Sequence, residues 1–338
     1  MARLRCGELH QWRVARRQRR PGDVLNIGAA VTGRQFHNQP EKSHLHGFLV
    51  DLWDEVRRAT GGALEITVHA QNAGIPGSDP AALKMLIAGE VEFIVLMGGL
   101  LGDVVPAAGI QGLPFAFTSH AQVHATDAGP LGEYLRREML AAGIRGFGGG
   151  LMENGFRHIV MREKPVRGVE DLAGVRMRVP DSPLFIETFT ALGATPVIAN
   201  ISELYSSLAS GRVDGQENPL AVCEVNGLYE VTRYVSLTSH MWSGFNLIGN
   251  LAFVQRLPVS TVSIVERAVA RHVARQCAYT DGFNRDLERG LADRGMIFNT
   301  ADVAGFRRAL STEFYRRSKE RFGRTAWTLL EDAVGRLG

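Results

Sequence analysis

Long apolar runs are missing from this 338-residue chain. No stretch approaches the roughly 20 consecutive apolar residues that a helix needs to cross a bilayer, so we expect no membrane-spanning segment. Cysteine is also scarce, with three residues (Cys6, Cys223 and Cys277) that show no CxxC spacing. The absence of this spacing disfavours a cysteine-based metal site. We interpret these residues as small hydrophobic side chains, although a disulfide between Cys223 and Cys277 remains a possibility.

Lysine is rare as well: only Lys42, Lys84, Lys164 and Lys319 stand among 38 basic residues, a skew that we interpret as coding bias. The charge is unevenly placed. Residues 1–20 hold seven arginines and one acid, so the net charge of +3 leaves −3 for the rest of the chain. A slightly acidic body argues against nucleic acid as a partner.

The basic start lacks the apolar segment of about 7–15 residues that a secretory signal requires. Its arginines lead directly into the apolar run at residues 24–31, which we expect to be the first strand. We predict that residues 1–22 form a disordered leader that contributes nothing to the fold. Either the reading frame starts elsewhere or the protein is not exported as written.

Motifs of catalysis are absent: the chain has no HExxH, GxSxG, Walker or EF-hand pattern. The glycines at 146, 148, 149 and 150 lack dinucleotide-binding spacing and favour a close-packed crossover. His44 and His46 are two residues apart and would point to different faces of a helix, so they cannot chelate together. We therefore expect no catalytic residue, cofactor or metal. His37 lies in the loop after the first strand, where α/β proteins bind ligands, and stays a candidate for the binding site.

Strand and helix patterns alternate along the chain. Residues 41–60 show helical spacing, residues 63–70 alternate like a strand, and residues 258–292 form the longest helical stretch. Such alternation predicts parallel-rich sheets covered by helices. The segments "LKMLIAGEVEF" and "LYSSLASGRVDG" both combine a helix, a glycine stop and a short apolar–acidic run, which favours two lobes of similar design.

Arg178 lies at the carboxyl end of a predicted strand in "GVRMRVP" that Pro180 ends. Ligands of open α/β sheets bind just beyond such strand ends. A buried guanidinium needs an anion, and its planar fork matches a carboxylate better than an ammonium does. From position alone, a solvated arginine or one paired with an internal acid remains the alternative.

Four segments occur together in this order: "NGFRHI" (154–159), "GVRMRVP" (174–180), "LGATPV" (192–197) and "GRVDGQENP" (211–219). They closely resemble the DctP-type substrate-binding proteins of tripartite ATP-independent periplasmic (TRAP) transporters. The resemblance runs from about residue 24 to the end of the chain, and "VDGQENP" is its most specific part.

The resemblance implies a set of binding residues. Arg178 corresponds to the main carboxylate clamp, and Arg157 and Asn218 correspond to residues that face the same cleft. Met97 and Ile201 replace a glutamate and an aromatic residue of the sialic-acid binders, which points to a smaller or less hydroxylated acid. We expect His240 and Trp242 to reach the cleft too, although Met97 and Trp242 could also belong to the core.

The implied fold is α/β, a two-lobed periplasmic-binding-protein-like fold with mixed or parallel sheets, hinge strands and a long bracing helix. We predict one lobe from residues 23–153 and about 243–282, and a second from residues 154–242 and about 283–338. The implied function is the capture of a small organic anion for TRAP permease subunits by a periplasmic, monomeric protein that is not an enzyme. Two alternatives are a cytoplasmic sensor and an enzyme acting on a small organic acid.

Overall fold

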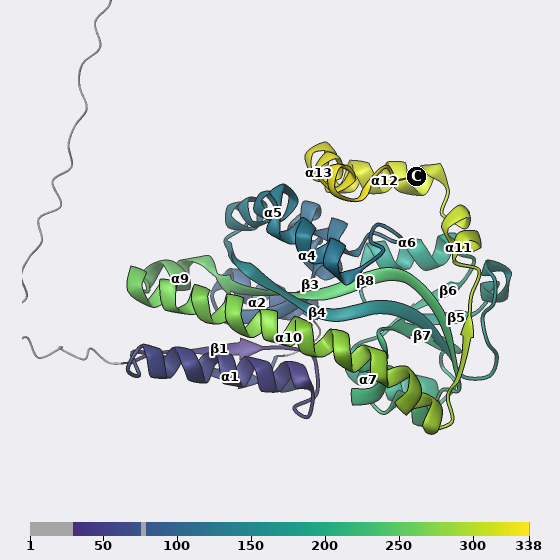
Figure 1. Ribbon diagram of the computed structural model, residues 1–338, viewed down its shortest axis with the longest axis horizontal. Coiled ribbons are helices and arrows are strands. Elements are labelled where there is room, and N and C mark those ends of the chain that lie inside the picture. The colour runs from purple at the N-terminus through teal and green to yellow at the C-terminus, as the bar shows by residue number, and fades with distance from the viewer. Residues whose placement is uncertain (1–29, 76–78, 338) are drawn as a thin grey trace, which may run out of the picture.

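The computed structural model describes residues 30–75 and 79–337 (Figure 1). The predicted leader, Cys6 and nearly all of the strand predicted at 24–31 lie outside these residues. Within the described part of the chain, no helix combines the length and apolarity that crossing a membrane would require.

The described residues form one mixed sheet of nine strands at the centre of the protein, in the order β2-β1-β3-β8-β4-β7-β5-β6, with β9 paired to β8. The pairs β1–β2, β1–β3, β5–β6 and β5–β7 are parallel, whereas β3–β8, β4–β8 and β4–β7 are antiparallel. The strands are β1 (Val31–Phe36), β2 (Leu64–His69), β3 (Phe93–Met97), β4 (Ile144–Met161), β5 (Arg176–Val179), β6 (Thr195–Ile198), β7 (Gly215–Asn218), β8 (Tyr234–Asn250) and β9 (Ile297–Thr300). The predicted mixed α/β architecture is confirmed.

Two long antiparallel strands, β4 with 18 residues and β8 with 17, run side by side through the middle of the sheet (Figure 1). They join β1–β3 at one end of the molecule to β5–β7 at the other. Their pairing shifts register between Glu153 and Gly155, where Gly155 has a φ of +117°. Such a bulge bends the pair locally, which suits strands that connect two lobes.

Helices cover the sheet: α1 (His44–Ala59), α2 (Asp79–Ala88), α3 (Gly98–Leu101), α4 (His120–Ala128), α5 (Pro130–Ala141), α6 (Pro183–Ala191), α7 (Ile201–Ala209), α8 (Leu220–Val225), α9 (Leu251–Arg256), α10 (Val259–Asp293), α11 (Val303–Ala309), α12 (Thr312–Phe322) and α13 (Arg324–Val334). Short 3₁₀ turns lie at η1 (Ala70–Asn72), η2 (Pro106–Gly112), η3 (Val169–Leu172) and η4 (Leu228–Glu230). Helix α10, of 35 residues, crosses the molecule along β4 and confirms the predicted long helix (Figure 1).

Local sequence explains where helices begin and end. In α1 the hydroxyl of Ser43 accepts a hydrogen bond from the His46 backbone N–H, and Leu45, Leu49, Leu52 and Val56 form one buried stripe. In α7 the carboxylate of Glu203 accepts from the Asn200 backbone N–H at 3.0 Å, as its capping-box spacing predicts.

The two segments that resemble each other occupy equivalent places in the two halves of the fold. Helix α2 leads through Gly89 to β3, and α7 leads through Gly211 to β7. Both glycines have positive φ, +78° and +72°, a conformation that ends a helix and that other residues rarely adopt.

The described strands add detail to the predicted order. The first of them is β1, whose polar sequence pairs with neighbouring strands on both sides. The segments around residues 144–161 form one strand rather than a crossover followed by a strand. The strand after Gly211 begins at Gly215 and contains the buried polar residues Gln216, Glu217 and Asn218.

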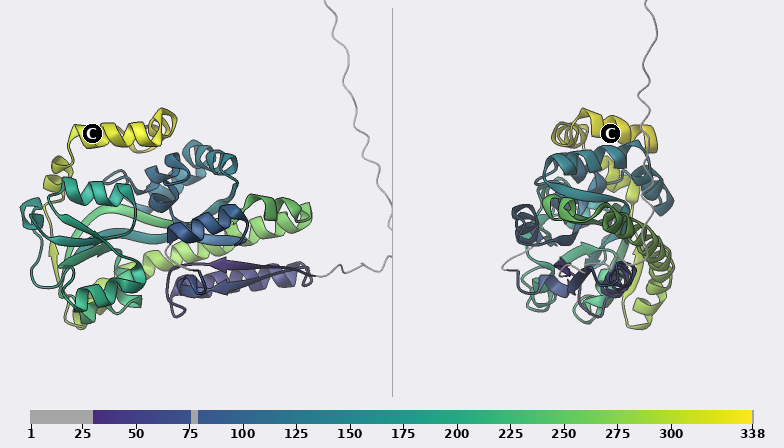
Figure 2. Two further views of the ribbon diagram at one scale, coloured as in Figure 1. Left: turned by 180° about the vertical axis from the view of Figure 1, so that it is seen from behind. Right: turned by 90° about the vertical axis from the view of Figure 1, so that its left-hand side faces the viewer.

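The C-terminal helices α12 and α13 fall within residues 283–338, which the sequence analysis assigns to the second lobe. Helix α13 packs on α4 and α5, and α12 packs on η2, all within the predicted first lobe (Figure 1 and Figure 2). Their buried faces, which include Phe322, Trp327 and Leu330, provide the apolar surface for this contact. The lobe boundaries themselves stay a prediction.

Candidate functional site

A cavity of about 40 Å³ lies where the ends of β3, β5 and β7 meet α2 and α7. Four charged residues line it: Asp79, Arg157, Arg178 and Asp181. Its neutral polar lining consists of Asn38, Gln39, Asn154, Asn200 and Asn218, and its apolar lining of Pro80, Met97, Leu100, Pro180, Ala199, Ile201, Val222 and Phe245.

Arg178 lies near the carboxyl end of β5, two residues before Pro180, and its side chain lines this cavity. Only 3% of the residue is exposed. Its Nε and Nη2 donate to the carbonyl oxygen of Ala199 at 2.9 and 2.6 Å. No acidic side chain among the described residues forms an ion pair with it, and burial lowers its pKa to about 10. A buried cation that contacts one backbone carbonyl and no acid is the arrangement in which an external anion can gain the most binding energy.

Arg157 is also buried, but an acid of the protein neutralises it. Its Nε donates to Glu217 Oε2 at 2.5 Å and its Nη2 to Glu217 Oε1 at 2.7 Å, a bidentate pair with 1% and 0% side-chain exposure. His240 Nε2 lies 3.3 Å from the same Oε2, and its Nδ1 lies 2.8 Å from the Thr238 hydroxyl. Burial alone would raise the pKa of Glu217, but Arg157 and His240 keep this pKa below its usual range.

Asn218 and Met97 hold Arg157 from two further sides. The Asn218 Oδ1 accepts from Arg157 Nη2 at 2.9 Å, and the Met97 sulfur lies 3.6 Å from Nη1. The ring of Phe185 lies below the guanidinium, 5.0 Å from its central carbon. These contacts fix Arg157 in place: polar groups surround the edge of its guanidinium, and the Phe185 ring packs against its face.

Four of the seven predicted site residues thus line one cavity: Arg178, Arg157, Asn218 and Met97. The other three lie outside its lining. His240 reaches it only through Glu217, and Trp242 points to a separate cluster around Glu153. His37 is buried next to the lining residue Asn38, where burial and His46, 3.0 Å away, lower its pKa to about 3. The roles of all seven in binding stay predictions.

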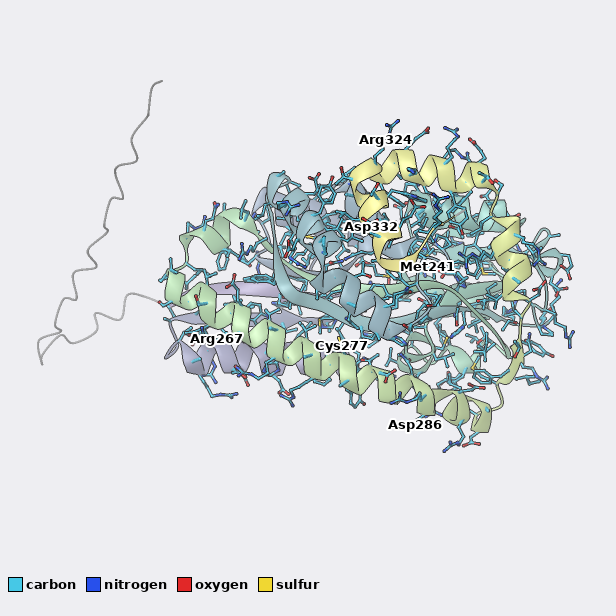
Figure 3. All side chains as sticks on the ribbon, turned by 45° about the horizontal axis from the view of Figure 1, so that its top comes forward. Met241, Arg267, Cys277, Asp286, Arg324 and Asp332 are labelled. Atoms are coloured by element: carbon cyan, nitrogen blue, oxygen red, sulfur yellow. The ribbon has the colours of Figure 1, made fainter. Side chains whose placement is uncertain are left out.

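Glu153 forms a buried polar cluster at the bulge of β4. Its Oε2 accepts hydrogen bonds from His120 Nδ1 at 2.8 Å and His124 Nε2 at 3.1 Å, and its Oε1 accepts from Trp242 Nε1 at 2.8 Å. Gln276 of α10 exchanges two hydrogen bonds with the Glu153 backbone, and Cys277 follows it midway along α10 (Figure 3). The cluster therefore connects α4, both long strands and the bracing helix.

The pKa values of this cluster make its stabilisation depend on pH. Hydrogen bonds with Cys277 and Glu153 raise the pKa of His124 to about 10, and although burial opposes it, His120 and His124 lower the pKa of Glu153 to about 2. The raised histidine pKa means that its contribution is complete below the unfolded value of about 6.5 and is lost as pH rises toward 10. The lowered glutamate pKa means that its contribution is present above about 4.5 and is lost as pH falls toward 2.

We expect the variant His124→Gln to be less stable than the parent protein at pH 6 by about 1–2 kcal/mol more than at pH 9, a value reduced for the partial exposure of the ring. Urea unfolding at both pH values measures this difference. Trp242→Phe removes a hydrogen bond of the same carboxylate without removing a titrating group, so its deficit should be equal at the two pH values. Equal deficits for His124→Gln would contradict the ion pair.

Several of these residues escaped the sequence reasoning. The sequence patterns do not single out Asp79, Asn38, Glu217 or Glu153, although Asp79 and Asn38 line the cavity. The family-like "QENP" segment was the one signal that could have pointed to Glu217.

Metal-binding clusters of three or more His, Cys, Asp or Glu side chains do not occur in residues 30–75 and 79–337. Cys223 and Cys277 are both free thiols, so the open possibility of a bridge between them is excluded.

Comparison with known proteins gives a family match over residues 36–320, to bacterial extracellular solute-binding protein, family 7 (DctP). An uncharacterized protein, y4mM of Sinorhizobium fredii, is 35% identical over 52% of this chain, which spans only 32% of that protein. A solute-binding protein of Verminephrobacter eiseniae is 27% identical over 90% of both chains. The C4-dicarboxylate-binding periplasmic protein DctP of Rhodobacter capsulatus is 27% identical over 79% of this chain and 74% of its own.

Solved structures agree with this match. A TRAP periplasmic solute-binding protein from a Sulfitobacter species, with bound β-D-galacturonate, has a TM-score of 0.84 and 25% identity and covers 90% of this chain and 99% of its own. A second from Roseobacter denitrificans, with bound L-galactonate, has a TM-score of 0.78 and 26% identity over 86% of this chain and 98% of its own.

Proposed function

This chain belongs to family 7 of the bacterial extracellular solute-binding proteins, the substrate-binding proteins of TRAP transporters, and we propose that it captures a small organic carboxylate between its two lobes. The captured acid is then delivered to the membrane permease of a TRAP transporter. The protein acts in the periplasm, as a monomer, and closes about the β4–β8 pair when the acid binds.

The observation that carries this proposal is the state of Arg178. It is a buried guanidinium in a cavity at the carboxyl ends of strands, and the Ala199 carbonyl is its one hydrogen-bond acceptor among the described residues. Burying a cation without a counter-charge is costly, so a position of this kind suits a ligand that brings the negative charge. Arg157 supplies the contrast, because Glu217 already neutralises it.

Magnitudes are consistent with this assignment. A hydrogen bond to a charged group contributes about 1.5–3 kcal/mol, while micromolar affinity needs roughly 8 kcal/mol. Two such bonds from Arg178, together with carboxamide contacts from residues such as Asn154 and Asn218, supply most of that energy. Apolar contacts with Leu100 and Phe245 supply the rest.

The ligands of similar proteins support the same class of compound. The two structural neighbours hold galacturonate and galactonate, and the Rhodobacter relative binds C4-dicarboxylates. Each of these compounds carries at least one carboxylate and is small enough to lie between two lobes.

A thermal-shift screen against small carboxylates tests the proposal. A bound ligand stabilises the folded state by RT ln(1 + [L]/Kd), about 2.7 kcal/mol at a hundredfold excess over Kd. We expect a subset of acids to raise the melting temperature, and the matching uncharged amides to have no effect. A screen of hydroxy acids, sugar acids and dicarboxylates in which no compound raises it would count against carboxylate capture.

A further inference from the structure

The cavity holds an acid opposite its arginine, and this second charge bears on what kind of carboxylate fits. Asp79 is the first residue of helix α2 and lines the cavity, which Arg178 also lines from near the carboxyl end of strand β5. Burial raises the pKa of Asp79, whereas hydrogen bonds and the nearby charge of Arg178 act to lower it, so the two side chains are close enough to interact electrostatically. No cationic side chain among the described residues forms an ion pair with Asp79.

Neutral amides hold the Asp79 carboxylate in position. Asn38 Nδ2 donates to Oδ2 at 2.6 Å and Asn72 Nδ2 donates to Oδ1 at 2.7 Å. The orientation of Asn38 is fixed in turn, because its Oδ1 accepts from Gln39 Nε2 at 2.8 Å. Each carboxylate oxygen has one partner and capacity to accept another, so Asp79 is a fixed acceptor at the cavity wall.

The charges of the lining are nearly balanced. Glu217 neutralises Arg157, so among residues 30–75 and 79–337 Arg178 is the one cation of the lining that no acidic side chain contacts directly. Asp79 and the exposed Asp181 carry charge of the opposite sign. A ligand with one carboxylate satisfies Arg178, but a second carboxylate would meet an acid instead of another cation. Like charges brought together at a binding site cost several kcal/mol.

The rest of the polar lining suits hydroxyl groups. Asn38, Gln39, Asn154, Asn200 and Asn218 are carboxamides, which donate and accept hydrogen bonds without charge. A hydroxyl can donate to Asp79 and accept from an amide, which a carboxylate cannot do.

We propose that Asp79 is a specificity-determining residue that selects hydroxylated monocarboxylates, by accepting a hydrogen bond from a hydroxyl remote from the carboxylate, and that rejects dicarboxylates. This inference rests on the proposed capture of a carboxylate by Arg178. It separates the sugar-acid type of ligand from the C4-dicarboxylate type within the same site.

Matched acids of equal length provide the test. D-Erythronate and meso-tartrate differ only in a hydroxymethyl group against a carboxylate, and L-galactonate and galactarate differ in the same way. Calorimetric titration of the full chain with all four gives two ratios of affinity, monoacid over diacid. We expect at least one ratio of about tenfold or more, because the diacid places like charges together.

Asp79→Asn should lower that ratio about tenfold or more, chiefly by improving the binding of the diacid. Asp79→Ser, which keeps an acceptor oxygen but not the charge, should lower it as well and covers the case in which one variant does not fold. Asp51→Asn, an exposed site on α1, removes the same charge and should leave the ratio unchanged.

Diacids that bind the parent protein as tightly as the monoacids, or a ratio that neither Asp79 variant changes, would overturn the inference and leave carboxylate capture standing. Binding of none of the four acids would overturn it too, whereas capture itself is judged by the wider screen and by Arg178.

Discussion

Replacing Arg178 with alanine should weaken carboxylate binding by roughly 2–5 kcal/mol, the range for truncating one partner of a buried, hydrogen-bonded charge pair. The reason is that, in the part of the chain that the structure describes, Arg178 is the one cation of the cavity lining without a contacting acidic side chain. Arg178→Lys keeps the charge but loses the planar fork, so its affinity should lie between those of the parent and the alanine variant. Calorimetric titration with an acid from the screen measures all three.

The stability of the ligand-free protein separates a binding role from a structural one. Removing Arg178 loses two hydrogen bonds to the Ala199 carbonyl but also removes a cation whose burial is costly, as its lowered pKa of about 10 indicates. These effects oppose each other, so the melting temperature of Arg178→Ala without ligand should change little.

Arg176 offers a matched control for this test. It lies two residues earlier on the same strand, exposed and paired with Asp214, so Arg176→Ala should bind the acid as the parent does. Unchanged affinity in Arg178→Ala, or equal losses in the two variants, would remove the basis of the proposed function.

Arg178 could be predicted from the sequence because all the features that indicate it lie within one short segment. A strand pattern, a proline that ends the strand and a fork-shaped cation can all be read within "GVRMRVP", and the structure places the residue at the end of β5, buried in a cavity. Helices α1 and α10 were predictable for the same reason: each has a stripe of apolar residues, and Ser43 caps the start of α1 while Pro258 stands just before α10.

Contacts between distant residues were out of reach. Glu217 is 60 residues from Arg157 in sequence, and Trp242 is 89 residues from Glu153. Nothing local in "GQEN" indicates a buried strand, because the partners that stabilise its buried polar residues lie on β4 and β8, far away in sequence. Asp79 shows a further limit: its position after a loop predicts a helix cap, and only the fold brings it opposite Arg178.

The Arg157–Glu217 pair has the opposite energetic character to Arg178. Both side chains are almost completely buried, and the guanidinium makes a bidentate contact. Such a pair adds little net stability relative to apolar residues, since desolvation offsets the attraction. Removing only one partner, however, leaves the other charge buried without compensation.

Glu217→Ala should therefore lower the free energy of unfolding by about 3–5 kcal/mol, because Arg157 would remain buried without its counter-charge. The double variant Arg157→Met/Glu217→Leu removes both charges and should recover a large part of that loss. Glu313→Ala breaks an exposed pair with Arg316 on α12 and should change stability little. Urea denaturation of these three variants, and of the single variants Arg157→Met and Glu217→Leu, at neutral pH measures the differences. If the double variant were as unstable as the sum of the separate Arg157→Met and Glu217→Leu changes, the two side chains would not act as a charge pair. A loss of unfolding free energy in Glu217→Ala no larger than that in Glu313→Ala would mean that water reaches Arg157. The proposed contrast between Arg157, neutralised by a protein acid, and Arg178, neutralised by a ligand, would then fail.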